Sequence, residues 1–153
     1  MRVIVDHLAG NRRGQRQQLD AASRVTIGRH PDSDIAFHVL ADRDASSRHA
    51  ELRPTDRGWV LIDLGSSNGT FVGPHRVSEA PIAVNDPVAV QFGEDGPAVR
   101  LWITEDENAA TVPPAQPWPL PNGRWRWRRR STWIALGVVL LAISGAIAVM
   151  LRH

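Results

Sequence analysis

The first hundred residues break into short apolar runs and alternations ended by Gly, Pro, Asn or Asp, and none of them carries the apolar spacing of a helix. A strand buries only one of its faces, so about ten such segments need a second sheet to cover them. The pattern therefore predicts an all-β sandwich. The expected strands are 2–8, 15–19, 24–28, 34–37, 49–53, 59–64, 70–72, 75–78, 87–92 and 98–104.

The expected core comes from the apolar positions that share one face of these strands, because side chains alternate along a strand. About one hundred residues are enough for a single core of this kind. The core candidates are Val3, Val5, Leu61, Val88, Val90, Leu101 and Ile103.

Charge divides the chain into two parts. Residues 1–107 hold all sixteen acidic residues and twelve of the eighteen arginines, a formal charge of −4, whereas the remaining 46 residues hold six arginines and no acid. A net acidic domain argues against long-range capture of nucleic acid. The chain has no cysteine, which excludes disulfides and thiolate metal sites. His7, His30, His38 and His75 lack the spacing of metal ligands, and we expect them at the surface.

Residues 108–123 differ in composition from the predicted domain, with five prolines between Pro113 and Pro121. Such a segment favours an extended polyproline conformation over a helix or a central strand. We interpret it as a semi-rigid linker. A docking ligand for a proline-recognising domain is the less favoured interpretation.

The nineteen residues from Trp133 to Leu151 contain no charged side chain. As a helix they would extend about 28 Å, close to the roughly 30 Å hydrocarbon core of a bilayer. We therefore expect a transmembrane helix over 131–151. The five arginines of the Arg/Trp segment 124–130 place the N-terminal domain in the cytoplasm by the positive-inside rule, with residues 152–153 across the membrane. The Arg/Trp segment could also be a nucleic-acid patch, but its position beside an apolar span favours a membrane flank.

Three short polar segments offer the groups that bind a phosphate. They are Gly-Arg at 28–29, Ser-Ser-Arg-His at 46–49, and the loop within 63–72, which reads Asp-Leu-Gly-Ser-Ser-Asn-Gly-Thr-Phe-Val. A guanidinium and hydroxyl groups together donate charge-assisted hydrogen bonds to phosphate oxygens. Taken singly, each residue is better explained as an ordinary turn or cap residue. Only a fold that brings the three segments together would make a site.

The order and spacing of Gly-Arg at 28–29, Ser-x-x-His at 46–49 and Asn-Gly-Thr at 68–70 resemble the signature of the forkhead-associated (FHA) domain. The resemblance covers roughly residues 3–104. It implies a β-sandwich of about eleven strands whose loops at one end bind a phosphothreonine peptide.

Position by position, the resemblance implies that Arg29 and Ser46 contact the phosphate and that Asn68, assisted by Ser67, holds the peptide backbone. Ser47 stands where the family often has Arg or Asn, and Arg48 could supply the missing charge. The expected phosphopeptide-binding residues are Arg29, Ser46, Ser47, Arg48, Ser67 and Asn68. The expected structural residues are Gly28, His49, Gly69 and Thr70.

These features predict a membrane-anchored phosphothreonine-binding adaptor in the cell membrane of a bacterium, with no enzymatic activity, cofactor or metal. Its expected partner is a phosphothreonine-containing protein, such as a serine/threonine kinase or a kinase substrate. The alternative is a phospho-independent scaffold subunit of a membrane complex. A hydrolase triad of Ser46, His49 and Asp63 is disfavoured because the nucleophile-elbow and oxyanion patterns are absent.

Overall fold

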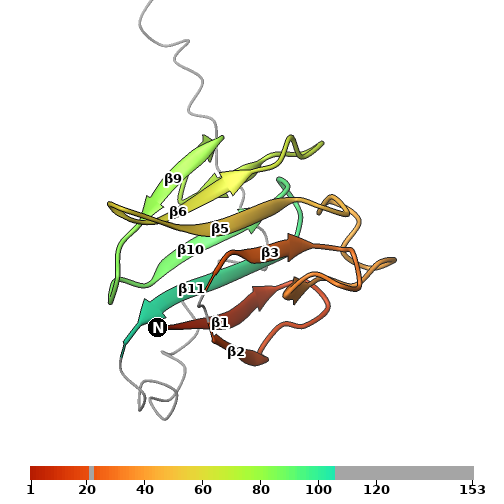
Figure 1. The fold of residues 1–153 in the computed structure, drawn as a ribbon. Helices are drawn as coiled ribbons and strands as arrows, with labels where there is room; N and C mark the ends of the chain where they lie inside the picture. Colours follow the sequence, from red (N-terminus) through yellow and green to blue (C-terminus); the bar gives the residue numbers. More distant parts are fainter. Residues whose placement is uncertain (21–22, 106–153) are drawn as a thin grey trace, which may run out of the picture.

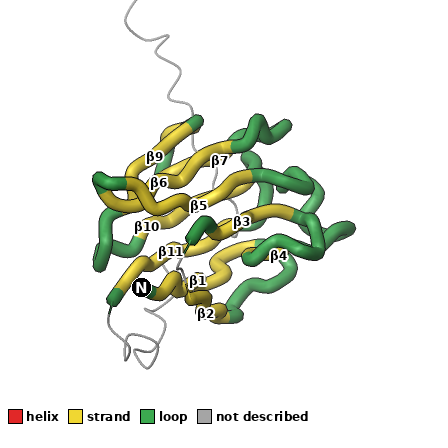
Figure 2. The backbone as a smooth tube through the Cα atoms, viewed as in Figure 1, coloured by secondary structure: helices red, strands yellow, loops and turns green. Residues whose placement is uncertain are grey.

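The computed structural model describes residues 1–20 and 23–105, which form two β-sheets with a shared core (Figure 1). The first sheet has the strand order β2-β1-β11-β10-β7-β8, and the second has the order β4-β3-β5-β6-β9. Within the described residues every regular element is a strand (Figure 2), which confirms the predicted all-β sandwich of about eleven strands. The strands are β1 (Arg2–Ala9), β2 (Arg16–Asp20), β3 (Val25–Gly28), β4 (Ile35–Ala36), β5 (Ala50–Thr55), β6 (Gly58–Asp63), β7 (Thr70–Val72), β8 (His75–Val77), β9 (Glu79–Ile82), β10 (Val88–Phe92) and β11 (Ala98–Thr104).

The hydrophobic core contains the inward-facing side chains of both sheets. Six of the seven predicted core residues are fully buried in it, and Val88 is partly buried and packs against it. Phe92 is the largest fully buried side chain, and its ring contacts both Phe37 and His49. The core therefore extends up to the loops that carry the candidate site.

One strand, β9, was not predicted from the sequence. It contains Pro81, which cannot donate a ladder hydrogen bond and so argues against a strand. The structure places β9 at the edge of the five-stranded sheet, where β6 is its one partner among the described strands. At an edge one side of a strand needs no partner, so a proline is tolerated there.

The prediction that His7 lies at the surface is wrong. His7 is 3% exposed and shares the inner face of β1 with Val3 and Val5, and its ring meets Phe37 edge-on. Burial lowers the pKa of His7 below its ordinary value, and the nearby Arg12 guanidinium lowers it further. Among the described residues no group of His, Cys, Asp and Glu is placed to hold a metal ion.

The predicted linker at 108–123, the Arg/Trp segment at 124–130, the predicted membrane helix at 131–151 and the tail at 152–153 lie outside the described residues. Within residues 1–20 and 23–105, no helix is long and apolar enough to cross a membrane.

The two ends of the sandwich differ in what they carry. Arg2 pairs with Thr104, so β1 begins and β11 finishes at the same end (Figure 1). The loops between β3 and β4, between β4 and β5, and between β6 and β7 lie at the opposite end. The described chain therefore begins and ends away from these loops.

Candidate functional site

Backbone hydrogen bonds join the three loops that carry the candidate residues. The amide of Arg29 donates to the carbonyl of Ser46 at 3.0 Å, and the amide of His30 donates to Ser47 at 2.9 Å. The amide of Leu64, at the start of the third loop, donates to the carbonyl of His49 at 2.9 Å. Main-chain contacts thus fix the relative positions of the loops, whatever the side chains do.

The Arg29 side chain is fixed by carbonyl groups of the loop between β4 and β5. Its Nε donates to Ala45 O at 2.5 Å and its Nη1 donates to Val39 O at 2.9 Å. A guanidinium has five N–H donors, and within the described residues these two bonds occupy two of them. The remaining three are available to an anion, and the arginine is already oriented before one binds.

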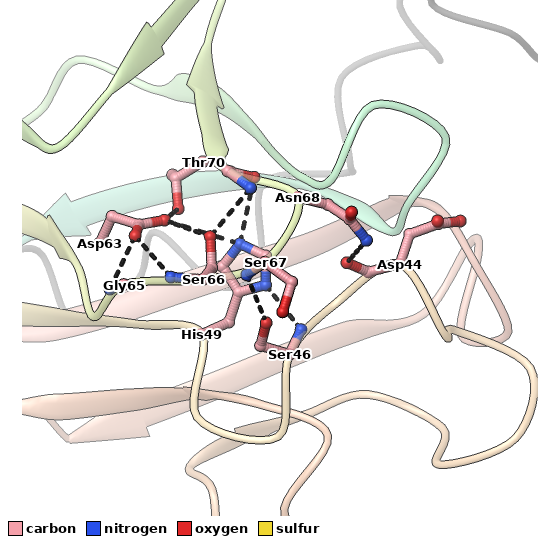
Figure 3. Close-up of polar contacts among 10 residues, drawn as sticks. Asp44, Ser46, His49, Asp63, Gly65, Ser66, Ser67, Asn68 and Thr70 are labelled. Atoms are coloured by element: carbon pink, nitrogen blue, oxygen red, sulfur yellow. Dashed lines mark hydrogen bonds and ion pairs between the residues drawn. The ribbon is translucent and has the colours of Figure 1, made fainter.

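The Ser46 hydroxyl accepts a hydrogen bond from the backbone amide of Ser67 at 3.1 Å (Figure 3). A hydroxyl is both a donor and an acceptor, so this contact leaves its proton free to bond to an oxygen of a ligand. The same contact joins the second and third loops.

Asn68 lies beside the same loop, and its side-chain Nδ2 donates to the carbonyl of Asp44 at 3.0 Å (Figure 3). The amide group retains a second N–H and its carbonyl oxygen. Asn68 can therefore offer a donor and an acceptor together, the pair that a peptide backbone requires.

His49 is fully buried beneath the loops and joins two of them. Its Nδ1 accepts from the backbone amide of Ser46 at 2.8 Å, and its Nε2 lies 3.2 Å from the carbonyl of Gly69. These contacts assign the proton to Nε2, which donates to Gly69. Burial lowers the pKa of His49, although the Gly69 carbonyl and the Asp63 carboxylate oppose this shift. The ring is therefore neutral and acts as a fixed bridge.

The Asp63 carboxylate organises the third loop (Figure 3). Its Oδ1 accepts from the amides of Gly65 at 2.9 Å and Ser66 at 2.8 Å. Its Oδ2 accepts from the hydroxyls of Ser66 and Thr70, both at 2.6 Å. Burial raises the pKa of Asp63, but the hydrogen bonds from Ser66 and Thr70 outweigh it and the net pKa is below the ordinary value. The Ser66 hydroxyl also accepts from the amide of Gly69 at 3.0 Å. The loop is thus held by one ionised side chain.

Gly28 and Gly69 occupy positions that no side chain fits. A Cβ on Gly28 would lie 2.2 Å from the carbonyl oxygen of Ser47, so the close approach of the first two loops requires glycine. Gly69 has a φ of +83°, and a Cβ there would lie 2.4 Å from Nε of Arg76.

Ser47 and Arg48 are exposed and lie differently from the other candidates. Within the described residues neither side chain bonds to Arg29 or Ser46, whereas Arg48 lines a hollow with His30 of the first loop and with residues of β3 and β5. The structure brings Arg29, Ser46 and the third loop together, and Arg48 lines the hollow beside them.

A hydrolase triad is not formed. Both ring nitrogens of His49 face backbone groups, and the Ser46 hydroxyl bonds to the amide of Ser67 and not to the imidazole. His49 Nε2 is 3.8 Å from the Asp63 carboxylate, and the ring is closed to solvent. In the part of the chain that the structure describes, no base is therefore in a position to activate Ser46.

Sequence reasoning missed the partners of the candidate residues. The groups that orient Arg29 and Asn68 are the main-chain carbonyls of Val39, Ala45 and Asp44, and every residue carries such a group. The organising role of Asp63 did have a signal. An Asp followed by small polar residues favours a turn in which its carboxylate accepts from the amides two and three residues later.

Comparison with known protein families agrees with the resemblance to the FHA domain found in the sequence. The family model of the FHA domain matches residues 25–93, which include all three loops and strands from both sheets. Residues 25–93 therefore match the FHA domain family.

Several curated relatives carry the same region. Glycogen accumulation regulator GarA of Mycobacterium tuberculosis is 42% identical over 81 residues, covering 53% of this chain and 48% of the relative. An oxoglutarate dehydrogenase inhibitor of Corynebacterium diphtheriae is 38% identical over 81 residues, covering 53% of this chain and 54% of the relative. The chain thus spans about half the length of the curated relatives it matches.

Solved FHA structures align with about two thirds of the chain. The Rv1747 FHA-1 domain of Mycobacterium tuberculosis aligns with a TM-score of 0.55 and 27% identity, covering 67% of this chain and 96% of that one. The FhaA FHA domain, solved in complex with the intracellular domain of Rv3910, aligns with a TM-score of 0.52 and 27% identity. The alignment covers 65% of this chain and 98% of the FhaA domain.

Proposed function

We propose that this protein binds phosphothreonine-containing segments of other proteins and acts as an adaptor. The observation that carries the proposal is the convergence of an oriented guanidinium on Arg29, a free hydroxyl proton on Ser46 and the amide of Asn68 at one end of the sandwich. A phosphothreonine brings close to two negative charges and three acceptor oxygens. Charge-assisted bonds from the first two residues match the phosphate, and Asn68 matches the backbone beside it.

Binding and not catalysis is the proposed activity, because the candidate residues offer donors that suit an anion and, within the described residues, no general base lies beside the Ser46 hydroxyl. One structural neighbour, at 26% identity, comes from an analysis of phosphothreonine-dependent FHA domain interactions, which supports the choice of ligand. The FhaA FHA domain was solved with the intracellular domain of another protein, which supports a protein partner. For this chain we expect a phosphorylated protein partner, such as a serine/threonine kinase or a kinase substrate.

The test compares three matched peptides carrying phosphothreonine, phosphoserine or threonine, with binding to the full 153-residue chain in detergent followed by fluorescence anisotropy. We expect strong preference for phosphothreonine and loss of binding in Arg29→Ala. The matched control is Arg57→Ala, an exposed arginine on the turn between β5 and β6. Equal binding of all three peptides, unchanged by Arg29→Ala, would instead favour a phospho-independent scaffold.

We also propose that residues 131–151 anchor the adaptor in the cell membrane, with residues 1–107 in the cytoplasm and 108–123 as the linker. The support comes from the uncharged span and the arginines before it. Confinement to the membrane would raise the effective concentration of adaptor and partner. Protease added outside intact cells should leave the domain uncut, and rapid cleavage there would reverse the proposed orientation.

A further inference from the structure

The outer face of the six-stranded sheet carries apolar side chains that the core does not use. Val3 and Ile103 point into the core, and side chains alternate along a strand. Their neighbours Ile4 and Trp102, which pair across β1 and β11, therefore lie on the outer face. Ile4 is only 1% exposed although it is not a member of the core, and none of the described strands lies over this face. The sheet thus has a second apolar centre outside the core.

The indole of Trp102 lacks a hydrogen-bond acceptor. Trp102 is half-buried and its Nε1 is closed to solvent, and within residues 1–20 and 23–105 no group accepts a bond from it. An indole N–H is a donor only, and a buried donor without an acceptor is costly. This position therefore requires a carbonyl or another acceptor from outside the described strands.

Further along β11 the same face is hollowed over β7, β10 and β11. Phe71, Ala89 and Ala98 line this hollow, and the two alanines leave room above their strands. Arg100 pairs with Ala89, but its Nε donates to Asp6 on β1 at 3.1 Å, so its side chain leans away from the hollow. An aromatic indole followed by a shallow apolar hollow is typical of surfaces on which proline-rich segments dock.

The charged side chains of this face bind one another. Asp6 accepts from Nε of Arg16 at 2.6 Å and from Nε of Arg100 at 3.1 Å. Arg2 lies 3.7 Å from Asp20. An uncharged segment suits such a face better than a strongly charged ligand.

The segment that follows β11 has the composition and the length to occupy the face. Residues 108–123 contain five prolines and no charged side chain. β11 ends at Thr104, on the same face, and the Asp and Asn within 105–108 favour a turn. The seven residues of β11 extend about 24 Å at about 3.4 Å each, which roughly eight polyproline II residues match at about 3.1 Å each.

We propose that residues 108–123 fold back and dock as a polyproline II segment on the outer face of the six-stranded sheet. The backbone carbonyls of this conformation have no internal partners, so one of them accepts from Nε1 of Trp102. The prolines pack on Ile4 and Trp102 and in the hollow over Ala89. The docked segment fixes the orientation of the β-sandwich relative to the residues after 123. The surface is separate from the loops of the candidate phosphate site.

The chain has no cysteine, so a pair of introduced cysteines reports the docking in the full 153-residue chain in detergent. At about 3.1 Å per residue after a turn at 105–108, residue 115 lies within roughly two residues of the level of Ala89. A short bismaleimide should cross-link Ala89→Cys/Ala115→Cys about ten-fold faster than the control pair Val60→Cys/Ala115→Cys, because docking raises the effective concentration. Val60 lies on the outer face of the five-stranded sheet, since its neighbours on β6 point into the core. Intact mass measures the cross-linked fraction.

Substitution of Trp102 completes the test. Adding Trp102→Ala to the first pair should slow cross-linking to the rate of the control pair. Trp102→Phe keeps a packed ring and removes the N–H, so it should slow cross-linking by a smaller factor. Equal rates for the two cysteine pairs, or a rate that neither substitution changes, would overturn the docking. Cross-links between two molecules whose yield rises with protein concentration would assign the face to a second copy of the chain and would overturn it as well. None of these outcomes depends on phosphopeptide binding.

Discussion

Removing the Ser46 hydroxyl gives the sharpest test of how the site binds phosphate. The change Ser46→Ala deletes one donor to the phosphate but keeps the backbone amide that bonds to His49, so the loop keeps its anchor. A hydrogen bond to a charged group contributes about 1.5–3 kcal/mol. The Kd for a phosphothreonine peptide should therefore rise roughly 10- to 150-fold, since about 1.4 kcal/mol corresponds to a factor of ten.

Stability should respond much less to the same change. The only bond of the hydroxyl within the described residues is the one it accepts from the amide of Ser67, which is exposed and can bond to water instead. The free energy of unfolding should fall by less than about 1 kcal/mol. Titration calorimetry gives the affinity, and urea unfolding followed by tryptophan fluorescence gives the stability.

Ser66→Ala is the matched contrast, because the Ser66 hydroxyl bonds to Asp63 and to the amide of Gly69 inside the loop. Ser66→Ala should lower the free energy of unfolding more than Ser46→Ala does. It should lower the affinity for the phosphopeptide less. An affinity of Ser46→Ala within two-fold of the wild type, in a protein that is equally stable, would refute a direct bond from this hydroxyl to the phosphate.

Three further predictions concern the framework of the site. Gly28→Ala places a methyl group against the carbonyl of Ser47 and should lower both the free energy of unfolding and phosphopeptide affinity, measured by urea unfolding and calorimetry. The pKa values of His7 and His49 are lowered by burial, so the unfolded state binds more protons as the pH falls. The contribution of both residues to the free energy of unfolding should therefore be complete above a pH of about 6.5 and decrease below it. A thermal melting temperature that stays constant from pH 7 to 5 would contradict this. Asp63→Asn should lower stability by about 2 kcal/mol at pH 7, and the difference from the wild type should shrink as the pH falls below 3.8 and the lowered pKa of the carboxyl is passed.

Much of the fold follows from local patterning. Alternation of apolar residues and turn signals predict ten of the eleven strands to within about two residues, because most of the strands bury one face against the other sheet. β9 was not predicted because Pro81 is a local signal against a strand. The position of this strand at a sheet edge makes the proline acceptable. His7 had a signal that was overlooked, since it continues the alternation of Val3 and Val5 on the inner face of β1.

The site was predictable in its residue types but not in its internal geometry. The spacing of Gly28, Ser46 and His49 indicates which segments meet, and glycine at position 28 is needed where two backbones approach closely. The orientation of Arg29 depends on carbonyl groups of a distant loop, which no residue type specifies. The place of Arg48 in a hollow lined by residues of β3 and β5 could be seen only with the strands in place.

The position of β11 has a consequence for the partners that the domain can reach. The turn before β11 lies beside the candidate site, where the amide of Gly93 bonds to Gly69, and the strand then runs to the opposite end at Thr104. Its seven residues at about 3.4 Å each separate the point of attachment from the recognition surface by roughly 24 Å. The chain therefore leaves β11 at the end of the sandwich opposite the recognition surface, so a partner approaches the candidate loops without meeting the end of this strand.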